Sequence, residues 1–448
     1  MGEFMKCERM SELQIGYAKV DITPSESVPM AGLGNSSQRK SEGVLDPIFA
    51  TCMAITDGCG TTALFYNLDI QNAYTPVTEM RRAISEITGL PREHVMLCFN
   101  HDHSSVDINN LQEESVKRYN SWLAEKLIQA GKEALADRRA AQMETARIQT
   151  RGLNFVRRYI MNDGSLFGDN FGSMEPGFRC HETEADRQLQ LIRFRRTGSR
   201  DVIVTNFQTH SNYTIRGRQI SGDVAGAFRA ALEQMSGCHV CHFNGASGNL
   251  NPTSRIPGEN VAKDLQDWGR RLAEYAMKAK YVPQSAGSLK TRQFTFEART
   301  NHSQDHLVPV AQQISDVFYA TNDRGKCIEM GRPHGITSAY HALAILENAK
   351  RAPTIPVHMF VFSLGDTAFA FAPIEMFDTN GMYIKEHSPF DMTFICGYAN
   401  YCQGYMPSKL AGENSGYEVL TSIFAPGNAE PLADQYLELL RELKNKAP

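Results

Sequence analysis

Short apolar runs alternate with amphipathic stretches along this chain, and the alternation predicts an α/β fold. Each run is bounded by polar or turn-forming residues, which favours a buried strand. The predicted strands cover residues 63–66, 95–99, 202–207, 239–243, 359–362, 368–372 and 393–396. Helical segments lie between them, so we expect mixed β-sheets with flanking helices.

Apolar residues at three- and four-residue spacing predict the helices. One begins with Thr75 as its N-cap and Pro76 at its first position, and it ends near Gly89. Others are predicted within residues 116–135, 261–275 and 432–443. Gly365-Asp366, between two apolar runs, indicates a tight hairpin. The stretch 157–181 is rich in Gly, Asn and Asp and is expected to form a long loop; its charged residues include Arg157, Arg158, Asp163 and Asp169.

Length and composition add a domain prediction. The chain has 448 residues, of which 42% are hydrophobic, which is enough for one large core. No repeat, low-complexity tract or linker divides it, so we predict a single domain over residues 13–448, preceded by an N-terminal extension or cloning remnant at 1–12.

Charge and cysteine usage bear on partners and location. The net charge is -4 and no run of Lys or Arg stands out, so neither nucleic acid nor a membrane surface is an expected partner. No apolar run approaches the ~18 residues of a spanning helix, and stable membrane insertion is not expected. Residues 1–12 lack the apolar stretch of a secretory signal, and the 10 cysteines are scattered. We therefore expect a cytoplasmic protein.

One cysteine spacing carries an alternative interpretation. Residues 238–242 read CHVCH, the attachment pattern of c-type haem. The segment is apolar and leads into a turn at Phe243-Asn244-Gly245, which favours a buried strand instead.

Metal-competent side chains follow several predicted strands directly. They are His101, His103, His210, Glu375 and Tyr405. In open α/β sheets, ligands bind in the crevice at the carboxyl ends of the strands. In an extended segment, residues two apart face the same side, so both histidines of the first pair are expected to address one centre. A lone histidine after a strand is more commonly structural. The residues therefore indicate a metal site only when they are considered together.

A series of motifs runs in order along most of the chain. They are IGYAKVDITP at 15–24, MAG at 30–32, QR at 38–39, HDHS at 101–104, the segment around His210, FNGASGNLNP at 243–252, APIE at 372–375, NYCQGYMPS at 400–408 and YE at 417–418. In this order they resemble the motifs of the neutral/alkaline ceramidases, in the catalytic domain of that family.

The resemblance implies a site and a mechanism. Its zinc ligands would be His101, His210, Glu375 and Tyr405, with His103 beside them as a catalytic histidine. Imidazole and carboxylate are ordinary zinc donors, and zinc makes water a nucleophile near neutral pH. His103 would transfer protons, and Tyr405 would also stabilise the oxyanion. The implied activity is zinc-dependent hydrolysis of an amide (N-acyl) bond.

Departures from the family pattern modify these expectations. Asn249 and Asn251 replace the Asp and Ser of the family turn, and Ser247 lacks the elbow motif of a serine nucleophile. Metal-activated water is therefore the expected nucleophile. The chain ends soon after the last motif, without the C-terminal β-sandwich of full-length ceramidases or a secretion signal. We accordingly expect a smaller and more polar N-acyl substrate than ceramide.

Two alternatives stay open. A zinc esterase or lactonase would use the same residues, since the sequence does not separate amide from ester attack. A non-catalytic binding protein with this fold is the other alternative, and the intact His, His, Glu and Tyr positions argue against it. Homo-oligomerisation is also left open.

Overall fold

The computed structural model describes residues 12–33, 35–72, 74–168 and 177–445. Nearly all of the predicted N-terminal extension, and Asp169, lie outside the described residues. No helix within the described ranges is both long and apolar enough to cross a membrane.

The largest sheet is mixed and curved around one side of the core. Its strand order is β14-β12-β11-β6-β1-β3-β4-β5, with β16 pairing β6. The pairs β4–β5 and β12–β14 are parallel, and the other pairs are antiparallel. The strands are β1 (Gln14–Asp21), β3 (Phe49–Thr56), β4 (Thr62–Leu68), β5 (Val95–Phe99), β6 (Arg139–Gln149), β11 (Gln188–Arg196), β12 (Val202–Phe207), β14 (His239–Asn244) and β16 (Val282–Gln284).

A second sheet packs against the inner face of the first. Its order is β17-β18-β19-β21, with only the last pair parallel. Aromatic and aliphatic side chains from both sheets fill the space between them, among them Phe65, Phe362 and Phe371. The strands are β17 (Leu289–Arg299), β18 (Thr354–Leu364), β19 (Thr367–Phe371) and β21 (Met392–Cys396).

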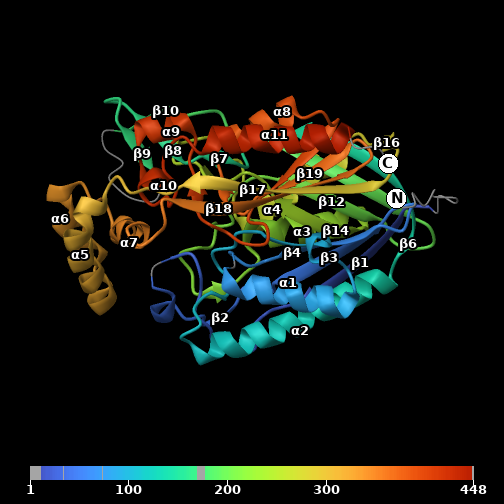
Figure 1. Cartoon of the computed structure of the whole chain (residues 1–448), viewed down its shortest axis with the longest axis horizontal. Helices are drawn as coiled ribbons and strands as arrows, with labels where there is room; N and C mark the ends of the chain where they lie inside the picture. The colour runs from blue at the N-terminus through green and yellow to red at the C-terminus, as the bar shows by residue number, and fades with distance from the viewer. Residues whose placement is uncertain (1–11, 34, 73, 169–176, 446–448) are drawn as a thin grey trace, which may run out of the picture.

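Helices cover the outer faces of both sheets and complete a four-layer arrangement (Figure 1). Four of them pack on the large sheet: α1 (Thr75–Thr88), α2 (Glu114–Ala136), α3 (Asp223–Ser236) and α4 (Leu265–Lys278). The second sheet is covered by α8 (Asp378–His387) and α11 (Ala429–Asn445). In α1, α2, α4 and α11 the buried residues form an apolar stripe, as their spacing predicts, whereas α3 is buried all round over Asp223–Arg229.

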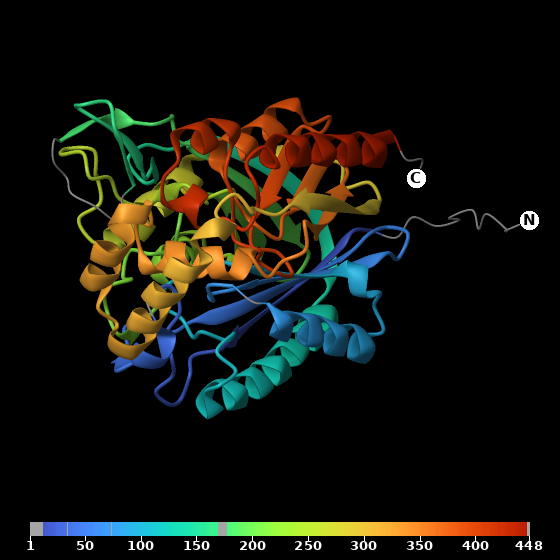
Figure 2. The ribbon, with the colours of Figure 1, turned by 60° about the vertical axis from the view of Figure 1, so that its left-hand side comes forward.

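A helical insert lies between β17 and β18. It consists of α5 (Val308–Thr321), α6 (Arg324–Gly331) and α7 (Ala339–Asn348), and it has a small apolar core of its own. Figures 1 and 2 show the insert at one end of the molecule, away from both termini.

Short elements complete the structure near the same end. One small sheet has the order β10-β8-β9, and the pairs β2–β13, β7–β15 and β20–β22 stand alone. The elements are β2 (Gly43–Val44), β7 (Phe155–Val156), β8 (Arg158–Met161), β9 (Leu166–Gly168), β10 (Phe178–His181), β13 (Gln219–Ile220), β15 (Leu250–Asn251), β20 (Glu375–Met376), β22 (Tyr405–Met406), α9 (Lys409–Asn414) and α10 (Tyr417–Leu420).

The predicted fold class is confirmed, and all seven predicted strands are present. The Gly365-Asp366 hairpin joins β18 to β19. Residues 239–242 of the CHVCH segment belong to strand β14, as predicted. Two helix starts differ. Thr75 is the first helical residue and not the N-cap, and α4 begins after Asp264, whose side chain accepts from the amide of Asp267.

The prediction of a long loop over 157–181 is wrong for the described part. Residues on both sides of the undescribed 169–176 form β8, β9 and β10. Arg157 and Arg158 are buried because Glu418 accepts hydrogen bonds from both of them. Polar composition predicts a solvated loop only when charged side chains reach water, and here they are paired inside the protein.

Candidate active site

Two strands far apart in the large sheet, the edge strand β5 and the next-to-edge strand β12, deliver the histidines to one place. His101 and His103 follow β5, and His210 follows β12. The two segments are joined directly, because the amide of His103 donates to the carbonyl of Ser211 at 2.9 Å and the Ser211 hydroxyl donates to the carbonyl of Asn100 at 2.9 Å. The curvature of the sheet therefore closes the site that the sequence only suggested.

The three imidazoles form a buried cluster. The ring centroids of His101 and His103 lie 4.8 Å apart, those of His101 and His210 lie 4.6 Å apart, and those of His103 and His210 lie 5.4 Å apart. One nitrogen of each ring lies within 4.8 Å of the nitrogens offered by the other two. Three imidazole nitrogens at this separation could hold a metal ion.

Backbone carbonyls fix the orientation of all three rings. The Nδ1 atoms of His101, His103 and His210 lie 3.2, 3.1 and 2.7 Å from the carbonyl oxygens of Gln71, Gly32 and Ser247, respectively. A carbonyl can only accept, so each Nδ1 carries a hydrogen and Nε2 is the ring nitrogen available to a metal. This is the usual support of a metal-binding histidine.

Glu375 joins the cluster from the second sheet. It lies in β20, which pairs with β22 so that Glu375 stands opposite Tyr405. Its Oε2 atom is 3.2 Å from Nε2 of His101 and 3.6 Å from Nε2 of His210.

The converging atoms lack the hydrogen bonds that burial normally demands. Oε2 of Glu375 and the Nε2 atoms of His103 and His210 are buried and have no hydrogen-bond partner within the described part of the chain. An unsatisfied buried polar atom costs roughly 1–3 kcal/mol, and a charged one costs more. A divalent cation would satisfy Glu375 and His210, since nitrogen with carboxylate oxygen is a normal donor set for such an ion, and the lone pair of His103 would stay free beside it. The residues fit a metal site.

Burial also sets the protonation of the histidines. Desolvation lowers the pKa of His103 and of His210 well below the ordinary value, and neighbouring positive charge acts in the same direction. Both imidazoles are therefore neutral at neutral pH, which is the form that binds a metal or accepts a proton.

Arg157 holds Tyr405 at the edge of the cluster. Its guanidinium donates to the Tyr405 hydroxyl at 3.0 Å, to Glu418 at 2.7 Å and to the carbonyl of Gly248 at 3.0 Å. Burial raises the pKa of Tyr405 well above 10, although Arg157 opposes the shift. Arg157 was not among the site residues predicted from the sequence, where its only signal was its charge within the expected loop 157–181.

Strained backbone lies directly at the site. His101 and Tyr398 have φ angles of 57° and 55°. Such angles are unfavourable for non-glycine residues and persist where the surroundings enforce them. The Tyr398 ring stacks on His101 with centroids 4.2 Å apart, and its hydroxyl is hydrogen-bonded to that of Ser247 at 2.8 Å. Ser247 thus supports the site through Tyr398 and His210.

The route by which His101 and His103 meet differs from the predicted one. We expected an extended segment with side chains two apart on one face. The positive φ of His101 instead turns the chain, and the residues that follow form a turn. Both side chains still address one centre, as predicted, because backbone carbonyls orient the rings.

Gly32 allows the chain to approach His103 closely. Its φ is 89°, and a Cβ atom there would lie 2.2 Å from Nδ1 of His103. Arg39 strengthens the same contact, since it donates to the carbonyl of His103 at 2.8 Å. The MAG and QR motifs therefore shape the wall of the site.

Two cavities reach the cluster from different sides. One, of about 850 Å³, is lined by His103, Arg157 and Tyr405 together with polar residues such as Asn212 and Asn251. The other, of about 400 Å³, reaches Glu375 and shares Tyr405 with the first. Each cavity gives solutes a path toward the unsatisfied atoms.

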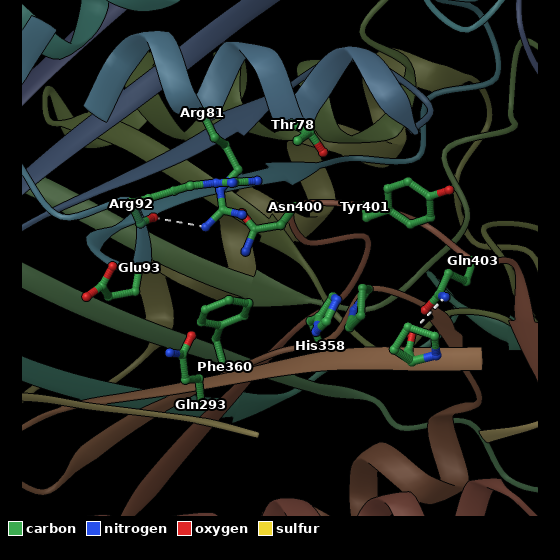
Figure 3. Close-up of a pocket in the computed structure, with 12 residues that line it drawn as sticks. Thr78, Arg81, Arg92, Glu93, Gln293, His358, Phe360, Asn400, Tyr401 and Gln403 are labelled. Atoms are coloured by element: carbon green, nitrogen blue, oxygen red, sulfur yellow. Dashed lines mark hydrogen bonds between the residues drawn. The ribbon is translucent and has the colours of Figure 1, made fainter. Parts of the chain in front are cut away.

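A further cavity, of about 590 Å³, touches none of the three histidines. Figure 3 shows its labelled residues, including Arg81 close to Asn400 and above Phe360. Arg81 is buried and donates to the carbonyls of Val95 and Arg92, and burial lowers its pKa to about 10. Its hydrogen bonds fasten α1 to the start of β5, which is a structural role.

The sequence and the structure were each compared with known proteins. No family model matches the sequence, and no curated protein matches it. Among solved structures, the neutral ceramidase from Pseudomonas aeruginosa superposes with a TM-score of 0.70 at 17% identity, covering 98% of this chain and 75% of that one. A ceramidase complexed with C2 gives 0.73 at 16% identity, covering 98% and 76%. The resemblance predicted from the motifs is therefore confirmed in three dimensions, and the chain has the neutral ceramidase fold.

Proposed function

We propose that this protein is a metal-dependent hydrolase that cleaves the amide bond of a small N-acyl substrate. One observation carries the proposal: buried, unpartnered donor atoms of His103, His210 and Glu375 converge beside a cavity. The fold supports the reaction class, since two solved structures with the same fold are ceramidases.

We propose zinc as the metal, held by His101, His210, Glu375 and Tyr405. The first three are supported by the approach of Glu375 Oε2 to both imidazoles, at 3.2 and 3.6 Å. Tyr405 is supported by its position opposite Glu375 in the short β20–β22 pair. A bound zinc ion supplies Lewis acidity, which polarises a carbonyl and makes water nucleophilic near neutral pH.

The remaining steps fall to side chains. His103 lines the larger cavity and its Nε2 lone pair is unpartnered, so it would take the proton of the attacking water and return it to the leaving nitrogen. Arg157 donates to the oxygen of Tyr405, which leaves the hydroxyl's own hydrogen for another acceptor. Tyr405 would thus donate to the carbonyl oxygen as negative charge develops on it.

Removing the Tyr405 hydroxyl is expected to slow hydrolysis and, because the hydroxyl is also a proposed ligand, to weaken metal binding, so the variant is assayed at saturating zinc. In Tyr405→Phe, kcat/KM should fall by roughly 10²–10³-fold, the usual cost of losing one oxyanion donor. The measurement is kcat/KM together with metal content per chain. Tyr319→Phe, on the exposed side of α5, is the control and should match the wild type. An unchanged kcat/KM in Tyr405→Phe would contradict the role given to the hydroxyl.

The proposed substrate is short or polar, not a long lipid. Polar side chains dominate the wall of the cavity at His103, including Asn212, Gln219, Asn251 and Thr253. A tunnel built for a lipid would bury methylenes, and each buried methylene contributes about 0.8 kcal/mol, or roughly fourfold in kcat/KM.

A panel of N-acyl ethanolamines of increasing chain length tests both the activity and the substrate class. We expect hydrolysis by the zinc-loaded protein, loss of it after chelation, and recovery when zinc is returned. Across the panel kcat/KM should change by less than about twofold per methylene. A steep rise toward long chains would restore ceramide-like lipids as substrates, and matched ester analogues decide between amidase and esterase. No hydrolysis of any member would favour the non-catalytic binding protein.

A further inference from the structure

The cavity beside His103 is lined by positive charge without negative charge to balance it. Four arginines contribute to its wall, and no aspartate or glutamate is among the described residues that line it. The arginines are Arg157, Arg216, Arg255 and Arg324.

Two of these arginines already have partners. Arg157 is buried against Glu418, as described above, and serves to orient Tyr405. Arg255 has an interaction of its own. Arg216 and Arg324 differ from them, because neither side chain forms an ion pair or hydrogen bond within the described ranges. Their charge is therefore directed at the cavity and at solvent.

The segment that carries Arg216 is held rigidly with respect to the histidines. Arg39 donates to the carbonyls on either side of it, those of Ile215 at 2.6 Å and Gly217 at 2.9 Å, and also to the carbonyl of His103. Asp223 holds the preceding residues by accepting from the amides of Tyr213 and Thr214. The backbone that carries Arg216 is therefore fixed before a ligand arrives, and only the arginine side chain has to be ordered on binding.

Arg324 approaches the same cavity from a separate part of the chain. It is the first residue of α6, in the helical insert that Figure 2 brings toward the viewer, and Asp323 before it caps the helix by accepting from the amide of Lys326 at 2.9 Å. The insert contributes a second wall residue, Tyr340. Two unpaired guanidinium groups from different elements thus line one space next to the reactive histidines.

We infer that this cavity binds an oxyanion carried by the substrate, a carboxylate or a phosphate, so that the substrate is an anionic N-acyl amide. The inference rests on the proposed function and names the substrate class for the same site. A guanidinium presents a planar fork that matches both oxyanions. Uncompensated arginines in a concave site also concentrate anions there. A neutral lipid amide would leave Arg216 and Arg324 unused.

The test compares charged and neutral amides that are otherwise matched. N-butanoylglycine is paired with N-butanoylglycinamide, and N-butanoyl-phosphoethanolamine with N-butanoylethanolamine. The metal-loaded wild type should have a higher kcat/KM for the charged member of at least one pair, and that preference should shrink as salt is added. The pair with the larger preference shows whether carboxylate or phosphate is the natural group.

Substitutions identify the residues responsible. Arg216→Ala and Arg324→Ala should each lower kcat/KM for the preferred charged amide by about 10- to 100-fold, the range for a lost charged hydrogen bond. The neutral amides should change by less than about threefold. Arg218→Ala is the matched control, because Arg218 lies two residues from Arg216 on the same segment but pairs with Glu42 at 3.1 Å and is not part of the cavity wall.

Equilibrium binding separates this inference from the proposed function. Calorimetry measures binding of the same four compounds to the metal-loaded protein and to the three variants. If no compound is hydrolysed, the proposed function fails, yet charge-selective binding that is lost in Arg216→Ala and Arg324→Ala would still support the oxyanion site. Equal binding and equal kcat/KM for charged and neutral members overturns the inference. A preference that survives both substitutions also overturns it, since the anion would then be held elsewhere.

Discussion

Replacing His210 by alanine is expected to strip the protein of most of its metal and to abolish hydrolysis. The His210 side chain is buried, its Nδ1 is fixed by the carbonyl of Ser247, and its Nε2 lies 3.6 Å from Glu375 without a hydrogen bond. Loss even of a group that supports a metal ligand typically lowers affinity by 10–100-fold, and loss of the ligand itself should cost more. Metal per chain, measured by mass spectrometry after dialysis, is the primary readout.

His387→Ala is the control for that experiment, since His387 is exposed on α8 and belongs to no part of the cluster. Thermal unfolding of both variants shows whether the fold is retained. This matters because replacing a buried imidazole by alanine leaves a cavity. Full metal occupancy in a folded His210→Ala protein would refute the proposed ligand set.

Replacing His103 by alanine is expected to separate catalysis from metal binding. His103 lines the larger cavity, whereas Glu375 makes its close approaches to His101 and His210. We therefore assign proton transfer to His103, and its loss should lower kcat by about 10²–10⁴-fold with metal content unchanged. The measurement is kcat on the best substrate of the N-acyl panel and metal per chain in the same preparation.

His103→Gln sharpens this experiment. An amide fills much of the space of the imidazole but does not take up a proton near neutral pH, so the variant should be as inactive as His103→Ala. Recovery of activity in His103→Gln would point to a packing role. The three histidines lie close enough for all of them to be ligands, and metal loss in both variants would move His103 into the ligand set.

The continuous apolar strands of the core could be predicted from local pattern alone. Strands such as β5 and β19 are buried on both faces, and an apolar run between polar residues indicates such a strand. The long antiparallel strands β6 and β17 were missed because polar side chains occupy many of their positions. Their place depends on pairing with neighbours distant in the sequence, which local periodicity does not contain.

The candidate site divides in the same way. The positions of His101, His210 and Glu375 at strand ends were readable along the chain, and the motifs suggested that they belong together. The distances between these side chains could not be predicted. They depend on the hydrogen bond between the segments that follow β5 and β12, and on the short β20–β22 pairing that sets Glu375 opposite Tyr405.

The sequence by itself therefore determined which residues are candidates for the proposed chemistry and that they follow strands of an α/β fold. Only the tertiary structure decided the charge of the space around them. Arg157 pairs with Glu418, far along the chain, whereas Arg216 and Arg324 reach one cavity unpaired. The physical reason is that backbone pattern is set by near neighbours, whereas pairing, burial and the balance of charge are set by contacts between segments that only folding brings together.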